Sequence, residues 1–203
     1  MIGPNGDKDP TKIYLAWCKE GLVAALDVDD SRCFVADPGS FWRAADCFEV
    51  MLTTPEGVKF KVDDPWSKFD HQLWFCPLAE TKHMFTGYWA NEKEQDEHQK
   101  KINERLKSSS AAAEWNGLAS GSDLRDARSC VVKTPRGYRA EFFIPGERFL
   151  GWEGMKPGAE VGLALTLLVE DLKNSQHELY WPNPKKEGAM KKPWTWARVK
   201  LAE

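Results

Sequence analysis

Much of this chain alternates between apolar and polar residues, which is the pattern of a β-strand with one buried face. The first example is "KIYLAW", in which Ile13, Leu15 and Trp17 fall on the same side. The next residues, "CKEGL", predict a hairpin turn at Glu20 and Gly21, and "GLVAALDV" then predicts a returning strand. The chain is therefore expected to begin its folded part with an antiparallel hairpin.

The same alternation recurs in short segments that are separated by turn residues. Further strands are predicted for "CFEVML", "HQLWF", "SCVVKT", "GYRAEFFI", "EVGLALTLLV" and "WARVKL". Eight or so short strands joined by turns are typical of an all-β protein. We predict an antiparallel β-sandwich with two sheets, of the jelly-roll or immunoglobulin-like kind.

One segment departs from this pattern, residues 91–107, with the sequence "NEKEQDEHQKKINERLK". Asn91 and Glu94 have the spacing of a capping box, which predicts the start of a helix. Its apolar residues are Ile102 and Leu106, so a helix here could bury one narrow apolar stripe. We predict a charged helical insert on the surface of the sandwich.

Polar and aromatic residues gather around the strand predicted at residues 47–52. Trp42 and Asp46 precede it, and Glu49 lies on the face opposite its apolar residues. In "HQLWF", Gln72 and Trp74 likewise lie opposite the apolar side chains. If these two strands are neighbours, Glu49, Gln72 and Trp74 share one face of a sheet.

This set of residue types suits a sugar ligand. The C–H face of a pyranose ring packs against an indole with the gain of any buried apolar contact. The sugar hydroxyls then need hydrogen-bonding partners, because unpaired buried polar groups are costly. We therefore expect Trp42 and Trp74 to stack on a sugar ring, and Glu49 and Gln72 to bind its hydroxyl groups.

The composition is that of an ordinary globular protein, with 203 residues, 42% hydrophobic and 29% charged. We predict one domain at residues 12–203, preceded by a flexible segment at 1–11. The chain has ten tryptophans, which is a large number for one core because tryptophan is rarely buried completely. Trp17 and Trp196 continue apolar patterns and Trp152 follows a connecting turn, so these three are expected to pack inside, which leaves others to cover the surface or line a site.

The charge balance excludes some partners. With 28 basic and 31 acidic residues the formal net charge is -3, so no basic field for nucleic acid is expected. The longest apolar run, "VGLALTLLV", is shorter than the roughly 20 residues that a membrane helix needs. The start, "MIGPNGDKDP", lacks the apolar core of a signal peptide, so the chain is cytosolic or belongs to a larger protein.

Cysteine usage indicates neither zinc nor a redox motif, because no C-x-x-C spacing occurs. Five cysteines cannot all pair with one another within the chain. We expect mostly free, buried thiols. The five are Cys18, Cys33, Cys47, Cys76 and Cys130.

Acidic residues gather at predicted strand ends. Asp27, Asp29 and Asp30 close one strand and Asp46 opens another, so their carboxylates could converge at one end of the sandwich. Such oxygen ligands on loops are what Ca²⁺ selects. A structural calcium site with Asp30 and Asp46 is one expectation, and a set of solvated turn aspartates is the other.

The residue types also include candidates for two other chemistries. A glycosidase needs two carboxylates facing each other across the sugar, for which Glu49 with Asp46 or Asp30 are the candidates. A haem group would need ligands such as His71 and Met51. Neither has a supporting motif, and we expect that the chain is not an enzyme.

Several of these segments, taken in order, resemble the family 9 carbohydrate-binding modules, which belong to the DOMON-like β-sandwiches. They are "YLAWCKEGLVAALDVDD", "FWRAADCFEVML", "HQLWF", "GYRAEFFIP", "GAEVGLALTLLVED" and "WARVKL". The likeness extends from about Lys12 to the end of the chain, with the charged helix as an insert. It implies a β-sandwich, noncatalytic binding of carbohydrate and a structural calcium ion.

The resemblance also implies roles for individual residues. Trp42 stands where the family has the first of two tryptophans that grip the sugar, and Glu49 where it has a carboxylate that contacts sugar hydroxyls. Gln72 also matches. For the second tryptophan the chain offers Trp181 or Trp194 at shifted spacing, and we take Trp181 as a third wall of the site.

The chain also departs from the family pattern. "WRAAD" has one residue more than the usual W-x-x-D, and Trp74 stands where the family has an arginine. The strand that usually precedes Lys12 is not recognisable. These departures lie at the positions that contact the sugar, whereas the strand pattern of the fold is kept.

The sequence as a whole predicts a noncatalytic module that binds a plant- or algal-type polysaccharide or oligosaccharide. The resemblance implies a place within a larger carbohydrate-active protein, outside the cell or in its envelope, with a fused or co-encoded glycoside hydrolase. The alternatives are a structural or protein-interaction β-sandwich without a sugar site, and a haem-binding DOMON-type cytochrome module.

Overall fold

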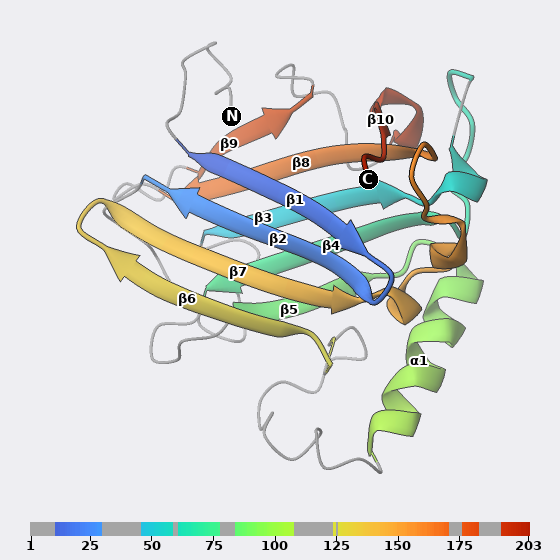
Figure 1. The fold of residues 1–203 in the computed structure, drawn as a ribbon, viewed down its shortest axis with the longest axis horizontal. Coiled ribbons are helices and arrows are strands. Elements are labelled where there is room, and N and C mark those ends of the chain that lie inside the picture. Colours follow the sequence, from blue (N-terminus) through green and yellow to red (C-terminus); the bar gives the residue numbers. More distant parts are fainter. Residues whose placement is uncertain are drawn as a thin grey trace.

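The computed structural model describes residues 11–29, 46–58, 61–77, 84–107, 124, 126–170, 176–182 and 192–203. Within these ranges the chain forms ten β-strands and one α-helix (Figure 1). The elements are β1 (Lys12–Cys18), β2 (Gly21–Val28), β3 (Cys47–Thr53), β4 (Asp70–Pro77), β5 (Met84–Trp89), α1 (Lys93–Lys107), β6 (Arg128–Thr134), β7 (Gly137–Pro145), β8 (Glu160–Glu170), β9 (Gln176–Trp181) and β10 (Ala197–Lys200).

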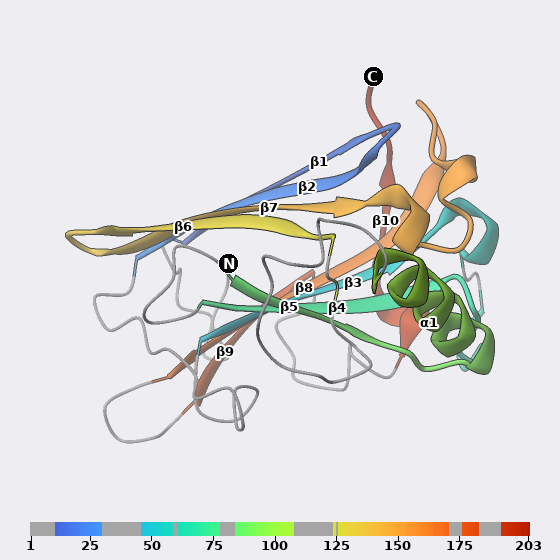
Figure 2. The same cartoon turned by 90° about the horizontal axis from the view of Figure 1, so that it is seen from below.

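The strands form two layers (Figure 2). One sheet has four strands in the order β1-β2-β7-β6. The other has six, in the order β10-β8-β3-β4-β5, and β9 pairs with β8 beyond the stretch that β10 occupies. The pairings are antiparallel. The structure therefore confirms the predicted antiparallel β-sandwich with one helical segment.

The main core lies between the two sheets, where the apolar residues of each alternating strand point inward. An aromatic cluster marks its centre: the ring of Phe142 from β7 stacks on Phe75 from β4, with centroids 3.7 Å apart. Phe48 from β3 contacts both rings. Burying such large apolar surfaces is the main free-energy gain that holds the two layers together.

The hairpin turn between β1 and β2 differs from the prediction by one residue. The turn consists of Lys19 and Glu20, and Gly21 is already the first residue of β2, opposite Cys18. Glycine is needed there because β7 passes very close: a Cβ on Gly21 would lie 2.1 Å from the carbonyl oxygen of Ile144. The glycine therefore serves strand packing rather than turn geometry.

The outer face of the six-stranded sheet carries a second, smaller core. Met51 and Ala164 from neighbouring strands pack there with Trp196, and Trp66 lies against them. The rings of Trp66 and Trp196 meet edge to face, with centroids 5.5 Å apart. The sequence pattern places Cys47, Glu49 and Met51 on this outer face of β3. Met51 is nevertheless fully buried, because the two tryptophans cover it.

Helix α1 packs across one end of the sandwich (Figure 1). The predicted cap is wrong by one residue, because Gln95 rather than Glu94 accepts hydrogen bonds from the backbone N–H groups of Asn91 and Glu92. The same Gln95 side chain donates to the carbonyl oxygen of Asp70 at 2.7 Å. It therefore caps the helix and also joins it to β4.

The buried side of α1 is largely polar. The guanidinium group of Arg148, which is fully buried, donates to Asp126 at 2.7 Å, to Gln99 at 3.1 Å and to Asn103 at 2.9 Å. Gln99 in turn donates to the carbonyl oxygen of Arg148. The apolar stripe expected from Ile102 and Leu106 is thus only part of this contact, and a hydrogen-bonded network supplies the rest.

A helical membrane crossing has no candidate in the described part of the chain. Its one α-helix is 15 residues long and is rich in charged side chains.

Candidate functional site

A row of side chains crosses the outer face of the six-stranded sheet. The strand registers place five residues in line, one on each of β5, β4, β3, β8 and β9. In that order they are Gly87, Trp74, Glu49, Thr166 and Tyr180. We call these five residues the outer-face row. Because side chains alternate along a strand, Gln72 lies on the same face as Trp74.

The structure thus brings together three of the residues singled out from sequence, Glu49, Gln72 and Trp74. The indole of Trp74 lies directly over Gly87, where a Cβ would come within 2.1 Å of the ring. A side chain at this position of β5 would push the indole away. Trp74 is 9% exposed and Gln72 is 8% exposed, so both are held firmly against the sheet.

The other half of the row is polar. Glu49 and Tyr180 are half-buried, while Thr166 between them is 1% exposed. In the described part of the chain, the Thr166 hydroxyl makes no hydrogen bond. A carboxylate, a hydroxyl and a phenol next to an indole can bind a ligand that has both an apolar face and several hydroxyl groups.

Sequence reasoning missed Thr166 and Tyr180. In "HELYW" the alternation shows that Tyr180 and Trp181 point to opposite faces. It does not show which of the two faces outward. That depends on the pairing of β9 with β8, which sets Tyr180 opposite Thr166 and Trp181 opposite Leu165.

Trp181 therefore does not lie with the outer-face row. Its partner Leu165 belongs to the core between the sheets. Trp181 is 38% exposed and lines a separate hollow of about 280 Å³ at the edge of the sandwich, with residues from β1 and β8. The geometry gives no support to its predicted place as a third wall beside Glu49.

Trp42 and Asp30, two further predicted site residues, lie outside the described residues. Asp46, the other predicted metal ligand, is fully buried immediately before β3. The remaining aspartates of that group pair with arginines, one on the neighbouring strand β7 and one in the turn between β6 and β7. The ion pairs are Asp27 with Arg139 and Asp29 with Arg136, each at 3.4 Å.

These contacts bear on the expected calcium ion. The described ranges contain no group of three or more His, Cys, Asp or Glu residues placed to hold a metal. Asp27 and Asp29 already interact with cations, which matches the alternative of turn aspartates. Of the two predicted calcium ligands the structure describes Asp46, which is buried, and a calcium site with Asp30 stays a prediction.

Asp46 and Glu49, one of the two carboxylate pairs considered for hydrolysis, do not face each other, and Asp30 of the other pair lies outside the described residues. Asp46 and Glu49 are three residues apart along an extended segment, so their side chains leave on opposite sides. Asp46 is fully buried, whereas Glu49 lies on the outer face. Two carboxyl groups on opposite sides of a strand cannot flank one glycosidic bond.

Both ring nitrogens of His71, the candidate haem ligand, form hydrogen bonds inside the core. Its Nε2–H donates to the carbonyl oxygen of Leu150 at 3.1 Å, and its Nδ1 accepts from the Tyr88 hydroxyl at 2.7 Å. Burial lowers the pKa of His71 to about 3, and it raises the pKa of Tyr88. Both ring nitrogens of this neutral imidazole are thus occupied, which leaves none to ligate iron.

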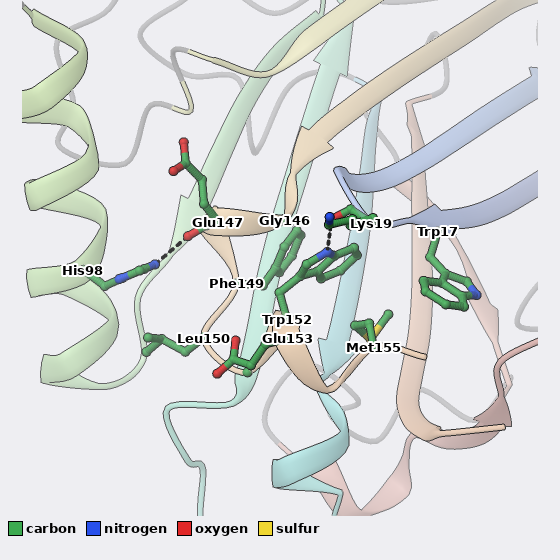
Figure 3. A pocket seen from close by; sticks show the side chains of 11 residues that line it. Trp17, Lys19, His98, Gly146, Glu147, Phe149, Leu150, Trp152, Glu153 and Met155 are labelled. Atoms are coloured by element: carbon green, nitrogen blue, oxygen red, sulfur yellow. Dashed lines mark hydrogen bonds between the residues drawn. The ribbon is translucent and has the colours of Figure 1, made fainter. Parts of the chain in front are cut away.

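A second hollow lies between the β1–β2 hairpin, residues 146–155 and α1 (Figure 3). Its volume is about 750 Å³. Trp152 stacks on Phe149 and its Nε1–H donates to the carbonyl oxygen of Lys19 at 3.2 Å. The ring of His98 hydrogen-bonds to the backbone of Glu147 at 2.6 Å. These side chains and backbone groups hydrogen-bond or stack with one another. We therefore interpret the hollow as a packing junction between the elements that surround it.

No protein-family model matches the chain, and no curated protein sequence matches it. Solved structures do match. One is a family 9 carbohydrate-binding module from Caldicellulosiruptor kristjanssonii in complex with glucose, with a TM-score of 0.61 and 14% sequence identity. The match covers 96% of this chain and 78% of that one.

A second match is a family 9 module from the same organism in complex with cellotriose. Its TM-score is 0.59 and its identity is 15%, over 97% of this chain and 78% of the other. The likeness extends over nearly the whole described sandwich. The chain therefore has the β-sandwich fold of the family 9 carbohydrate-binding modules.

Proposed function

We propose that this chain is a noncatalytic module that binds carbohydrate on the outer face of its six-stranded sheet. The observation that carries the proposal is the outer-face row, in which the Trp74 indole lies beside the Glu49 carboxylate, with Gln72 next to Trp74. An apolar ring and charged or amide acceptors side by side are the two things that a pyranose requires.

Trp74 and Trp42 are the proposed stacking residues. Trp74 is held by the backbone of Gly87 beneath it, so its ring loses little freedom when a ligand binds. Glu49 and Gln72 are proposed to accept and donate hydrogen bonds to sugar hydroxyls. Thr166, whose buried hydroxyl makes no hydrogen bond in the described part of the chain, extends this polar half.

The neighbours with this fold support the same role, since their structures contain glucose and cellotriose. By analogy we propose a plant- or algal-type poly- or oligosaccharide as ligand. We further propose that the chain is an accessory part of a larger extracellular or envelope protein, fused to or encoded beside a glycoside hydrolase. The noncatalytic role agrees with the side chains of Asp46 and Glu49, which leave the chain on opposite sides at and just before β3.

A structural calcium ion held by Asp30 and Asp46 is a separate proposal. Hard oxygen ligands at a strand entry would suit Ca²⁺, and binding to the folded state alone would stabilise it. The thermal midpoint of unfolding should then fall when a chelator is added and recover with Ca²⁺. A midpoint that is the same in chelator and in Ca²⁺ would rule the ion out.

Calorimetric titration with a panel of oligosaccharides tests the proposed function. We expect Trp42→Ala to weaken binding about tenfold or more, from the loss of one stacking surface. Glu49→Gln should weaken it about 10- to 100-fold, since hydrogen bonds to a charged group are the stronger kind. Trp181→Ala, on the other face of the sheet, is the matched control and should leave affinity unchanged.

The second candidate is a structural or protein-interaction module without a sugar site. The low exposure of Trp74 and Gln72, below one tenth each, is the observation that favours it. It predicts no heat with any glycan in the panel. Titrations in which wild type and all three variants are equally silent would replace the carbohydrate proposal with this one.

A further inference from the structure

Two cysteines lie directly opposite each other on the outer face of the six-stranded sheet. In the antiparallel pairing of β3 with β4, Phe48 is opposite Phe75, so the next position along sets Cys47 opposite Cys76. Both thiols are reduced in the structure, and both residues are buried, at 1% and 0% exposure. No local sequence motif indicates this pairing, because the two cysteines are far apart along the chain.

The geometry fits a covalent bond. Directly opposite residues on antiparallel strands have Cα atoms about 4.5–5.5 Å apart, and a disulfide accepts about 4.4–6.8 Å. Since Cys47 and Cys76 point to the same face, their sulfur atoms lie together, and the Cys76 side chain hydrogen-bonds to the Cys47 thiol. Neither backbone would have to move far for a bond to form.

We propose that Cys47 and Cys76 are a redox pair that forms a disulfide bond between β3 and β4. The oxidant is a small disulfide such as oxidised glutathione. One cysteine thiolate attacks it and releases one thiol, and the second cysteine thiolate then attacks the mixed disulfide and releases the other. The protein loses two protons and two electrons, which the small disulfide gains as it leaves as two thiols.

The surroundings predict slow exchange in the folded protein. The hydrogen bond between the two thiols, together with burial and the negative charge of Glu49, raises the pKa of Cys47 well above its ordinary value. The Cys47 thiolate is therefore scarce and both thiols are shielded from solvent, so exchange must wait for folding or for a local opening of the two strands. Once formed, the buried disulfide would be shielded from reductants in the same way.

Such a bond would link the two strands that carry Glu49 and Trp74, each of which lies two residues from the cysteine on its own strand. It would also close a long loop between residues 47 and 76, which restricts the unfolded chain and stabilises the folded one. The proposal does not depend on a sugar ligand, since the disulfide itself is what is measured.

Thiol mapping of the full-length protein tests the pair. The reduced protein is held in a glutathione redox buffer until its thiol content is constant, then quenched in acid, alkylated in urea and digested with trypsin. Trypsin places the two cysteines on separate peptides, 44–59 and 69–82, and each of the other three on a peptide of its own. We expect one linked species of peptides 44–59 and 69–82, which reduction splits.

Matched variants make the result specific. Cys47→Ser and Cys76→Ser should each abolish the link, whereas Cys130→Ser, at an exposed position of β6, should retain it. Oxidation in concentrated urea should give a mixture of links instead. Both peptides recovered alkylated, either cysteine linked to Cys33, or the same mixture with and without urea would overturn the proposal.

Discussion

The outer-face row depends on a residue that has no side chain. The indole of Trp74 rests where the Cβ of any other residue at position 87 would be, and this contact fixes the ring beside Glu49. A glycine in the middle of a strand is costly in conformational freedom, so its presence indicates a close approach. The approach here is that of an aromatic ring from the neighbouring strand.

Gly87→Ala should therefore displace the Trp74 ring and destabilise the protein by about 1–3 kcal/mol, the usual cost of overpacking a tight contact. Urea unfolding measures this directly. The matched control is Gly154→Ala, since a Cβ there would lie 3.5 Å from the nearest atom, in Pro55. Equal stability of the two alanine variants would show that the indole does not need the glycine.

His71 shows how burial can turn an ionisable residue into a structural one. Its imidazole is held neutral by the core and bridges the Tyr88 hydroxyl and the backbone of Leu150. The folded pKa is about 3, against 6.5 for an ordinary histidine. In the unfolded chain the ring takes up a proton as the pH falls through 6.5, while in the folded protein it does not.

The folded state should consequently lose stability as the pH falls from 6.5 towards 3. By pH 5 the loss from this one residue is about 2 kcal/mol. His71→Gln, measured by urea unfolding at pH 7 and pH 5, should lack that part of the loss although it is less stable at both. A variant that loses as much stability as wild type between these pH values would contradict the assignment.

At the residue scale, sequence sufficed where strand alternation alone decides orientation. Glu49, Gln72 and Trp74 could be placed on one face from their positions relative to Leu73 and Phe48. Trp181 could not, because its face depends on which strand β9 joins and in what register. A shift of one residue moves every side chain of a strand to the other face.

At the scale of elements, α1 is the part whose role is least visible in its pattern. A helix with two apolar residues would be expected to lie loosely on the surface. Gln95 and Gln99, one turn apart, instead enter the interior and bind backbone groups of Lys68, Asp70 and Arg148. Because amides satisfy buried carbonyl oxygens, a polar stripe can fix a helix as firmly as an apolar one.

Arg148→Met tests this network. It leaves Asp126 without its cation and the side-chain oxygens of Gln99 and Asn103 without their donor, and should cost about 3–5 kcal/mol. Gln99→Leu, which removes two hydrogen bonds, is the milder variant and should cost about 1–3 kcal/mol.

The control for both variants is Lys100→Ala on the exposed side of α1. Its ion pair with Asp96 is open to solvent, so urea unfolding should show no measurable change. If Arg148→Met were as stable as this control, the helix would be held by something other than the network.

Prediction of the helix itself succeeded, while prediction of its contacts failed, for a physical reason. The run of charged and amide residues between 93 and 107 has high helix propensity whatever it packs against. Whether a glutamine is solvated or buried depends on a partner that is distant in sequence, such as Arg148. No local pattern contains that information.

At the scale of the molecule, the fold could be predicted because each inner strand repeats its alternation long enough to specify a face. The clearest case is β8, whose inner residues Leu165 and Leu167 are buried while β3 and β9 pair on either side. The second cluster on the outer face could not be foreseen. Trp66 and Trp196, which form it with Met51, come from loops far apart in the chain.

Places in the described part of the chain where a sugar could bind include the outer-face row, the hollow beside Trp181 and the hollow between α1 and the β1–β2 hairpin. Of these three, the outer-face row is the one that combines an indole with a carboxylate and an amide on one sheet face. We therefore predict where on the molecule the sugar binds, in addition to the binding itself.

A crystal structure of the protein soaked with cellotriose tests that claim most directly. We predict a sugar ring packed against the Trp74 indole, with its hydroxyls in hydrogen-bonding contact with Glu49 and Gln72. Sugar density in either of the other two hollows, or none at saturating ligand, would contradict the account.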